Sequence, residues 1–236
     1  MSRRKILLSI LALTTAGALG CWFTSPSTAT RDPSVPLPKE IVQANHVSDG
    51  EREIYLAGGC FWGTEELLRY VRGVTSVEVG YANGVTKNPT YRDVCNGSGH
   101  AETVHVVYRP DEISLSELLK IYFQSIDAAS LNRQGNDRGV QYRTGIYFSD
   151  VADAPTIEQA LQRLQQEYSK PVVVEHAPIE NFYRAEDEHQ AYLVKNPHGY
   201  CHVPRWLLDE QRKASVVDEQ NFPRDKKYTK PDEATL

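Results

Sequence analysis

The chain has 236 residues, of which 40% are hydrophobic and 24% charged, and its formal net charge is -5 at pH 7. This length and composition fit one folded domain around one hydrophobic core. The charge lacks the basic excess typical of nucleic-acid binding, so we expect a small-molecule or peptide ligand and no nucleic-acid partner.

The first 21 residues have the features of an export signal. Arg3, Arg4 and Lys5 precede an apolar run that extends to about Leu19. This run is at the short end for crossing ~30 Å of hydrocarbon, which favours a signal peptide over a retained anchor. Both the general and the twin-arginine export routes fit, because two adjacent arginines also occur in ordinary basic segments.

A cysteine ends this segment. The stretch Ala18–Cys21 resembles a bacterial lipoprotein cleavage site, which predicts a lipidated Cys21 and attachment to a membrane surface of the bacterial envelope. Without such a signal the protein would be cytoplasmic. Residues 22–51 are rich in proline and serine and predict a disordered linker. We expect the folded domain at 52–206 and an irregular, charged tail at 207–236.

Periodicity predicts the elements of the folded domain. Alternating apolar residues indicate strands, and apolar residues at helical spacing indicate helices. Ser114 and Glu117 form a capping-box pattern at the start of one helix. The expected segments, in chain order, are strand Glu53–Ala57, helix Phe61–Arg72, strands Val74–Tyr81 and Glu102–Tyr108, helix Leu115–Ile126 and strand Tyr142–Phe148.

This β-α-β-β-α-β order predicts the fold class. It is typical of an α/β protein of the two-layer α+β kind, with a ferredoxin-like split βαβ core and helices on one face of a mixed or antiparallel sheet. A helix from about Ala154 to Tyr168, a strand Val172–His176 and a short helix Glu186–Lys195 extend this core.

Three cysteines, Cys60, Cys95 and Cys201, remain in the domain once Cys21 is assigned to the signal. An odd number in an exported domain suggests a free thiol. Cys60 follows two glycines where a strand meets a helix, and the unpaired N–H groups and dipole of a helix start favour a thiolate. A buried structural cysteine is the alternative at this position.

The residues around Cys60 resemble a known motif. Gly59–Gly63, followed by Thr64 and Glu65, is similar to the nucleophile motif of the A-type peptide methionine sulfoxide reductases. Four further blocks agree with this family in order and spacing, and the five blocks span residues 53–201. The four are Asn88–Arg92 running to Cys95, Gly99–Glu102, Arg133–Asp137 with Gln141–Arg143, and Asn196–Cys201.

The resemblance implies thiol-dependent reduction of the S epimer of methionine sulfoxide, with Cys60 as the nucleophile. It leaves open whether free methionine sulfoxide is used as well as the protein-bound form. Glu102 would protonate the sulfoxide oxygen, with a pKa raised by aromatic shielding. The other implied site residues are Tyr91 and Tyr142 as hydroxyl donors to that oxygen, Asp137 in the polar network, and Phe61 and Trp62 in the substrate pocket. From sequence alone, a solvated glutamate and half-buried tyrosines are the commoner situations.

The resemblance also implies a second half-reaction. Cys201 matches the resolving cysteine, which would form a disulfide with an oxidised Cys60. A thioredoxin-like reductant would then open that disulfide, so the partners are this reductant and oxidised proteins or peptides. We expect a monomer without cofactor or metal that repairs proteins under oxidative stress, and a merely packed Cys95.

Three other functions compete with this interpretation. A cysteine acyl-transferase or protease would pair Cys60 with a histidine base. A zinc-binding module would need ligands at poor spacings, and a non-enzymatic surface lipoprotein would have no reactive thiol. The candidate bases are His100, His105 and His189, and the candidate zinc ligands are Cys95, His100, His105, Cys201 and His202.

Overall fold

The structure is a computed structural model, and it describes residues 41–42 and 47–221, with side chains from 47 to 215. The chain divides into two units, residues 1–31 and 32–236, and every described residue belongs to the second. The predicted signal and lipidation site lie outside the described residues, as does most of the predicted linker. Within the described part, no helix is both long enough and apolar enough to cross a membrane.

A mixed seven-stranded sheet forms the centre of the domain, in the order β1-β9-β3-β4-β2-β7-β8. Strands β3, β4, β2 and β7 are antiparallel neighbours, whereas β1 is parallel to β9 and β8 is parallel to β7. The strands are β1 Ile41–Val42, β2 Arg52–Gly58, β3 Val74–Ala82, β4 Ala101–Tyr108, β7 Thr144–Phe148, β8 Glu175–Pro178 and β9 Phe182–Arg184. A separate ribbon pairs β5 (Arg133–Gln134) with β6 (Asp137–Arg138).

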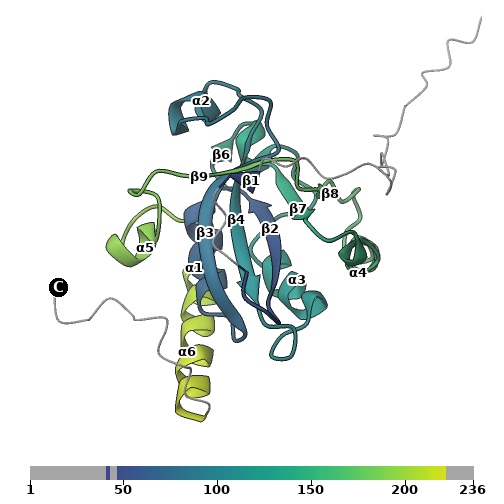
Figure 1. Ribbon diagram of the computed structural model, residues 1–236, viewed down its shortest axis with the longest axis vertical. Coiled ribbons are helices and arrows are strands. Elements are labelled where there is room, and N and C mark those ends of the chain that lie inside the picture. Colours follow the sequence, from purple (N-terminus) through teal and green to yellow (C-terminus); the bar gives the residue numbers. More distant parts are fainter. Residues whose placement is uncertain (1–40, 43–46, 222–236) are drawn as a thin grey trace, which may run out of the picture. The chain divides into compact units, whose positions relative to one another are not determined.

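Helices α1 and α3 lie behind β3, β4 and β2 in the view of Figure 1, and α6 extends along the lower end of α1. The α-helices are α1 Phe61–Arg69, α2 Tyr91–Cys95, α3 Leu115–Phe123, α4 Ala154–Gln165, α5 Tyr192–Lys195 and α6 Arg205–Asn221. Two short 3-10 helices occupy Val140–Tyr142 and Val151–Asp153.

The core of the domain lies between this helix layer and the sheet. Ile54 and Leu56 of β2 and Val104 of β4 pack against Leu68 of α1 and Tyr122 of α3. Strand alternation sends every second side chain to this face, so it also directs Glu102 toward α1.

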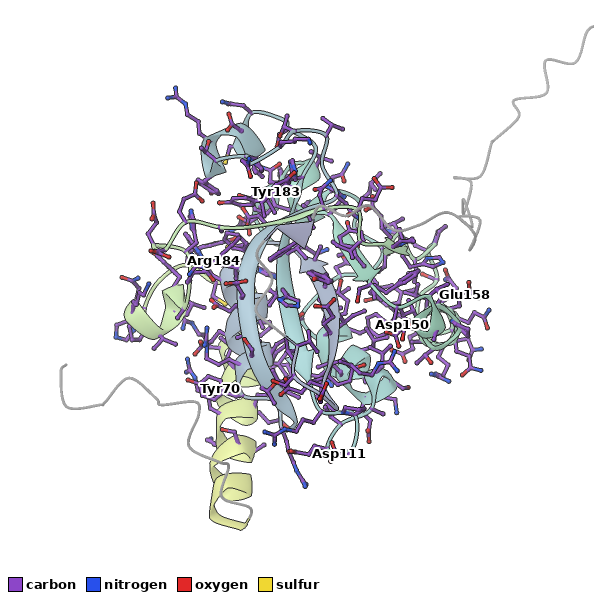
Figure 2. All side chains as sticks on the ribbon, in the orientation of Figure 1. Tyr70, Asp111, Asp150, Glu158, Tyr183 and Arg184 are labelled. Atoms are coloured by element: carbon purple, nitrogen blue, oxygen red, sulfur yellow. The ribbon has the colours of Figure 1, made fainter. Side chains whose placement is uncertain are left out.

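The other face of the sheet has its own buried layer, which contains polar pairs. The His105 ring stacks on Tyr55 and bonds through Nε2 to a Glu53 oxygen at 2.8 Å. Arg184 of β9, labelled in Figure 2, donates to Glu78 of β3 at 2.7 Å. Thus His105 lies on the opposite side of the sheet from α1.

The predicted α/β class and the mixed sheet are confirmed. Strand β4 lies between β2 and β3, which is the strand order of a split βαβ arrangement. Several boundaries differ. The strand predicted at Val172–His176 is β8, which begins at Glu175, and the helix predicted at Glu186–Lys195 is a turn followed by the single turn of α5. The strand predicted from Tyr142 begins at Thr144, because Tyr142 ends a 3-10 helix. The helices predicted to end at Arg72, Ile126 and Tyr168 each end three residues earlier.

The prediction of an irregular C-terminal tail is wrong as far as residue 221, because α6 occupies this stretch. Leu207 and Leu208 of α6 pack with Val203 against Leu67 of α1. In the sequence these two leucines stand among charged residues and give only a weak helix signal. The helix is stabilised because they pack against α1, a contact that the sequence alone does not reveal.

Candidate active site

A tight turn places Cys60 at the amino end of α1. Gly58 ends β2, Gly59 has φ +76°, and Cys60 is the N-cap residue of the helix. A Cβ atom on Gly59 would lie 2.6 Å from the Cβ of Gln134, so both the backbone angle and the packing require glycine here.

Two functional groups lie at the free N–H groups of this helix start. The Phe61 N–H donates to Glu102 Oε2 at 3.1 Å, and the Trp62 N–H lies close enough to the sulfur of Cys60 to lower its pKa. The predicted nucleophile and the predicted acid are therefore neighbours at one helix terminus, where the dipole favours negative charge on either of them.

The thiol of Cys60 does not have the lowered pKa that its position predicts. Cys60 is only 6% exposed, and burial, followed by the charges of Glu102, Asp137 and Cys201, raises its pKa well above the usual range. The N–H of Trp62 lowers the pKa by less. Cys60 is therefore a thiol in this structure, because desolvation outweighs the effect of the helix terminus on its pKa.

Glu102 does have the expected raised pKa. Its side chain is buried on β4, with 1% exposure, and burial and the nearby Asp137 raise its pKa to about 8 against the opposing N–H of Phe61. A carboxyl group with this pKa holds its proton at pH 7 and can act as a hydrogen-bond donor.

Two tyrosines face Glu102 from different segments. Tyr91 is the first residue of α2, Tyr142 is the last residue of a 3-10 helix, and their side chains are hydrogen-bonded to each other. Burial and then the charge of Glu102 raise the pKa of both phenols, which also makes Glu102 their neighbour. The pair presents neutral hydroxyl donors beside the carboxyl group.

Cys201 lies one helical turn from Cys60. A Cβ on Gly63 would be 2.9 Å from Cys201 Sγ, so the sulfur rests against the backbone of α1. The thiol bonds to the carbonyl of Val203 at 3.4 Å, and both cysteines are free thiols. Burial raises the pKa of Cys201 as well.

Asp137 is held beside the same segment. Tyr200, the residue before Cys201, donates to Asp137 Oδ2 at 2.9 Å. This bond joins the β5–β6 ribbon to the segment that carries Cys201. The structure thus brings together all six predicted catalytic residues, which are Cys60, Tyr91, Glu102, Asp137, Tyr142 and Cys201.

An aromatic wall surrounds the two predicted pocket residues. The rings of Trp62 and Tyr192 are stacked with centroids 3.7 Å apart, and the Trp62 Nε1 donates to His189 Nδ1 at 3.3 Å. The His189 ring also lies 5.4 Å from Phe61 and 4.7 Å from Tyr91. Burial lowers the pKa of His189, which keeps the imidazole neutral within this wall.

Sequence reasoning missed several residues that hold the site. Glu186 accepts from the Tyr81 hydroxyl at 2.6 Å and from the Tyr91 N–H at 2.8 Å, and thereby fixes the start of α2. From the sequence, His189 is considered only as a candidate base and Tyr192 is not assigned, whereas both contact Trp62. Their only signal is a cluster of aromatic and polar residues in a segment without regular periodicity.

The histidines proposed as alternative bases have other partners. His100 Nδ1 contacts Ser98 Oγ at 3.0 Å, His105 bonds to Glu53 on the far face of the sheet, and His189 accepts from Trp62. Within the part of the chain that the structure describes, no three His, Cys, Asp or Glu side chains form a cluster able to hold a metal ion.

The prediction of a packed Cys95 is wrong, because this residue is exposed. It lies one turn after Tyr91 on α2 and is hydrogen-bonded to the Tyr91 side chain. Helix α2, which is not predicted from the sequence, is a short surface helix that leaves its last residue in solvent.

A thiol beside a protonated carboxyl group and two phenols defines a thiol-dependent oxidoreductase as the class of protein. The family model "Peptide methionine sulfoxide reductase" matches residues 52–221. A peptide methionine sulfoxide reductase MsrA of Lachnoclostridium phytofermentans is 48% identical over 164 residues, which cover 69% of this chain and 99% of the relative. An MsrA of Clostridium perfringens is 54% identical over 153 residues, covering 64% and 98%.

Solved structures agree. Reduced Mxr1 of Saccharomyces cerevisiae has a TM-score of 0.64 and 36% identity over 66% of this chain and 92% of its own. Methionine sulfoxide reductase A of Corynebacterium diphtheriae has a TM-score of 0.60 and 36% identity over 70% and 85%. The chain belongs to the peptide methionine sulfoxide reductase family, and its activity is that of a peptide-methionine (S)-S-oxide reductase.

Proposed function

We propose that Cys60 attacks the sulfur of methionine sulfoxide while Glu102 protonates the sulfoxide oxygen. A new bond forms between the two sulfur atoms and is then replaced by a sulfur–oxygen bond on Cys60. Methionine leaves reduced, and Cys60 becomes a sulfenic acid that carries the oxygen. The observation that supports this proposal most directly is the raised pKa of Glu102, about 8, at the helix start that it shares with Cys60.

The arrangement of donors suits the charge that develops during attack. As the Cys60 sulfur attacks, negative charge accumulates on the sulfoxide oxygen. Glu102 gives its proton to that oxygen, and the proton released by the thiol restores Glu102, so the step consumes no net proton. The Glu102 proton and the hydroxyls of Tyr91 and Tyr142 would neutralise that oxygen, while Trp62 and Phe61 would enclose the methyl group. Because these donors are already buried and oriented, little reorganisation is needed in the reaction.

We infer that Cys201 resolves the sulfenic acid. Its sulfur would attack Cys60, forming a disulfide and releasing the sulfenic oxygen as water. The position of Cys201 against Gly63 supports this step. Arg205 donates to the carbonyls of Pro197 at 2.8 Å and Gly199 at 2.7 Å, which ties the loop before Cys201 to the start of α6. A thioredoxin-like dithiol would supply the two electrons that reopen the disulfide.

The test of the nucleophile uses the two separated sulfoxide epimers of one peptide, with dithiothreitol as reductant. Wild type should convert the S epimer, Cys60→Ser should convert neither epimer, and Cys95→Ser should match wild type to within about twofold. Conversion by Cys60→Ser at the wild-type rate would refute the proposed nucleophile. The exposed Cys95 serves as the control for removal of a thiol, because serine keeps a hydrogen-bonding group beside the Tyr91 side chain.

The resolving step requires a separate test. With thioredoxin as reductant, Cys201→Ser should release about one methionine per enzyme and then stop, because its sulfenic acid has no partner thiol. Quenched-flow sampling would count the methionine released. Sustained turnover by this variant would show that Cys201 is not the resolving thiol.

We also propose that the protein is exported and lipidated at Cys21. The basic and apolar pattern before Ala18–Cys21 supports this assignment. Mass spectrometry of the native N-terminus should find a chain that begins with a lipid-modified Cys21 in the membrane fraction. An unprocessed Met1 in the soluble fraction would overturn the assignment.

A further inference from the structure

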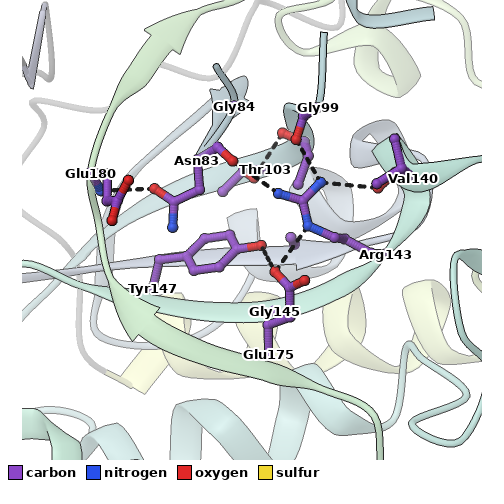
Figure 3. Close-up of polar contacts among 12 residues, drawn as sticks. Asn83, Gly84, Gly99, Thr103, Val140, Arg143, Gly145, Tyr147, Glu175 and Glu180 are labelled. Carbon is purple, nitrogen blue, oxygen red and sulfur yellow. Dashed lines mark hydrogen bonds and ion pairs between the residues drawn. The ribbon is translucent and has the colours of Figure 1, made fainter. Parts of the chain in front are cut away.

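A buried guanidinium group lies directly behind the site. Arg143 follows Tyr142 in the chain and is only 7% exposed. Figure 3 shows its hydrogen bonds: Nη1 donates to the carbonyls of Val140 and Gly99, both at 3.0 Å, and Nη2 donates to the carbonyl of Asn83 at 3.2 Å. One side chain therefore joins three backbone segments.

Each of these segments leads into the site. The carbonyl of Val140 belongs to the 3-10 helix that ends at Tyr142, so this bond closes the turn that carries the phenol. Gly99, with φ +78°, lies three residues before Glu102 at the entry to β4. Asn83, with φ 50°, follows the end of β3.

The guanidinium is itself oriented from the sheet edge. Glu175 of β8 accepts from Arg143 Nε at 2.9 Å and from the Tyr147 hydroxyl at 2.7 Å (Figure 3). The carboxylate balances the buried positive charge and fixes the rotation of the guanidinium plane. The two Nη atoms of the guanidinium are then directed at the three carbonyls.

We propose that Arg143 is a positioning residue that aims the Tyr142 hydroxyl at the sulfoxide oxygen. This inference rests on the proposed role of Tyr142 as a donor to that oxygen. Without the guanidinium, the carbonyl of Val140 would keep only the longer bond from the Arg143 backbone N–H, at 3.3 Å, and the carbonyl of Gly99 would lose its link to this turn. The 3-10 helix could then turn, which moves the hydroxyl although Tyr142 remains present.

Lysine cannot replace this arginine. Its ammonium has three donors on a single atom, whereas the hydrogen bonds of Arg143 leave from three nitrogens in one plane. Arg143→Lys therefore keeps the charge and removes the planar geometry. This substitution tests whether the planar geometry of Arg143, and not its charge, positions the Tyr142 hydroxyl.

The experiment is a double-mutant cycle of Arg143→Lys and Tyr142→Phe on the S-epimer peptide, with circular dichroism as the folding check. Arg143→Lys should lower kcat by about tenfold and change KM by less than about twofold. The double variant should be no slower than Tyr142→Phe alone, because the hydroxyl on which Arg143 acts is gone. Losses that multiply would overturn the inference.

Two further variants complete the test. Arg184→Lys alters another arginine that pairs with a glutamate, on the far face of the sheet, and should leave kcat unchanged. If Arg143→Lys does not fold, Glu175→Leu tests the same idea from the sheet edge. It should lower kcat by about threefold, and only where Tyr142 is present. A wild-type rate for Glu175→Leu would overturn the inference.

The outcomes separate the inference from the proposed function beneath it. If Tyr142→Phe alone has the wild-type kcat, the proposed role of Tyr142 fails, and the Arg143 inference fails with it. If Tyr142→Phe is slow and Arg143→Lys multiplies that loss, Tyr142 keeps its role and only the positioning inference is overturned.

Discussion

Helix α1 has buried ionisable groups at two places, and only one of them is paired with arginines. Around its first turn lie Cys60 and Glu102, and the charged neighbour of Glu102 is another acid, Asp137. In the next turn Glu65 pairs with Arg69, and Glu66 pairs with both Arg69 and Arg212. These two regions show how one helix can serve both chemistry and assembly.

The carboxyl groups of Glu102 and Glu65 make the comparison direct, because they are 1% and 2% exposed. Burial raises both pKa values, to about 8 for Glu102 and about 7 for Glu65. The charge of Arg69 and the N–H of Ala191 hold the pKa of Glu65 lower. A buried acid without a cation keeps its proton for transfer, whereas one beside a cation holds structure.

The paired region fastens the C-terminal segment to α1. Glu65 accepts from the Ala191 N–H at 2.9 Å, and Glu66 pairs with Arg212 of α6. The Arg212 guanidinium also lies 5.6 Å from the centroid of the Tyr70 ring, which is labelled at the lower end of α1 in Figure 2. This attachment positions the residues between β9 and α6 that border the first region.

Of the substitutions that separate the two regions, Glu102→Gln should have the largest effect. The amide can still donate a hydrogen bond but cannot transfer a proton, so kcat/KM should fall by about 100-fold or more. In wild type, kcat/KM should decline as pH rises through about 8, where Glu102 ionises. A pH–rate profile of both proteins checks this, and a variant that keeps the wild-type basic limb would assign that limb to another group.

The same variant should have the opposite effect on stability. Because the pKa of Glu102 is about 8 in the folded protein and 4.5 ordinarily, the folded state binds more protons across this window. The free energy of unfolding of wild type should therefore fall as pH rises from 4.5 to 8. At pH 9, Glu102→Gln should be more stable than wild type by roughly 1–3 kcal/mol in urea unfolding. Equal stability at pH 9 would contradict the buried, protonated state.

Arg212→Met removes one of the two cations that pair with Glu66. We expect a loss of about 1–2 kcal/mol in urea unfolding, because Glu66 keeps Arg69 and Arg212 is partly exposed. The matched control is Arg109→Met, which breaks the more exposed pair with Glu112 and should cost less than about 1 kcal/mol. A larger loss for Arg109→Met would show that burial does not distinguish the two pairs.

The smallest expected effect is that of Glu65→Gln on substrate binding. Ala191 lies between His189 and Tyr192, and both of these contact Trp62. A weaker acceptor for the Ala191 N–H should loosen this wall and raise KM by about threefold, with kcat nearly unchanged. Steady-state kinetics on the S-epimer peptide measures the split, and a loss confined to kcat would argue against a role in binding.

The sequence determined the elements whose signals are local. Alternation and helical spacing predict β2 and α1, the pair of glycines predicts the turn before Cys60, and the capping box at Ser114 starts α3 where expected. The five co-linear motifs determined the family and the set of six residues that the structure brings together. All of these depend on neighbouring residues or on matched spacing, which a sequence contains directly.

Only the tertiary structure decided the electrostatics of the site and its C-terminal border. The helix start by itself predicts a thiolate at Cys60, yet burial by distant segments raises that pKa. Likewise, the leucines of α6 are buried only because α6 packs against α1. Arg143 donates to carbonyl groups from segments that lie far apart in the chain. Desolvation and long-range hydrogen bonds depend on which segments meet, and that information exists only once the chain has folded.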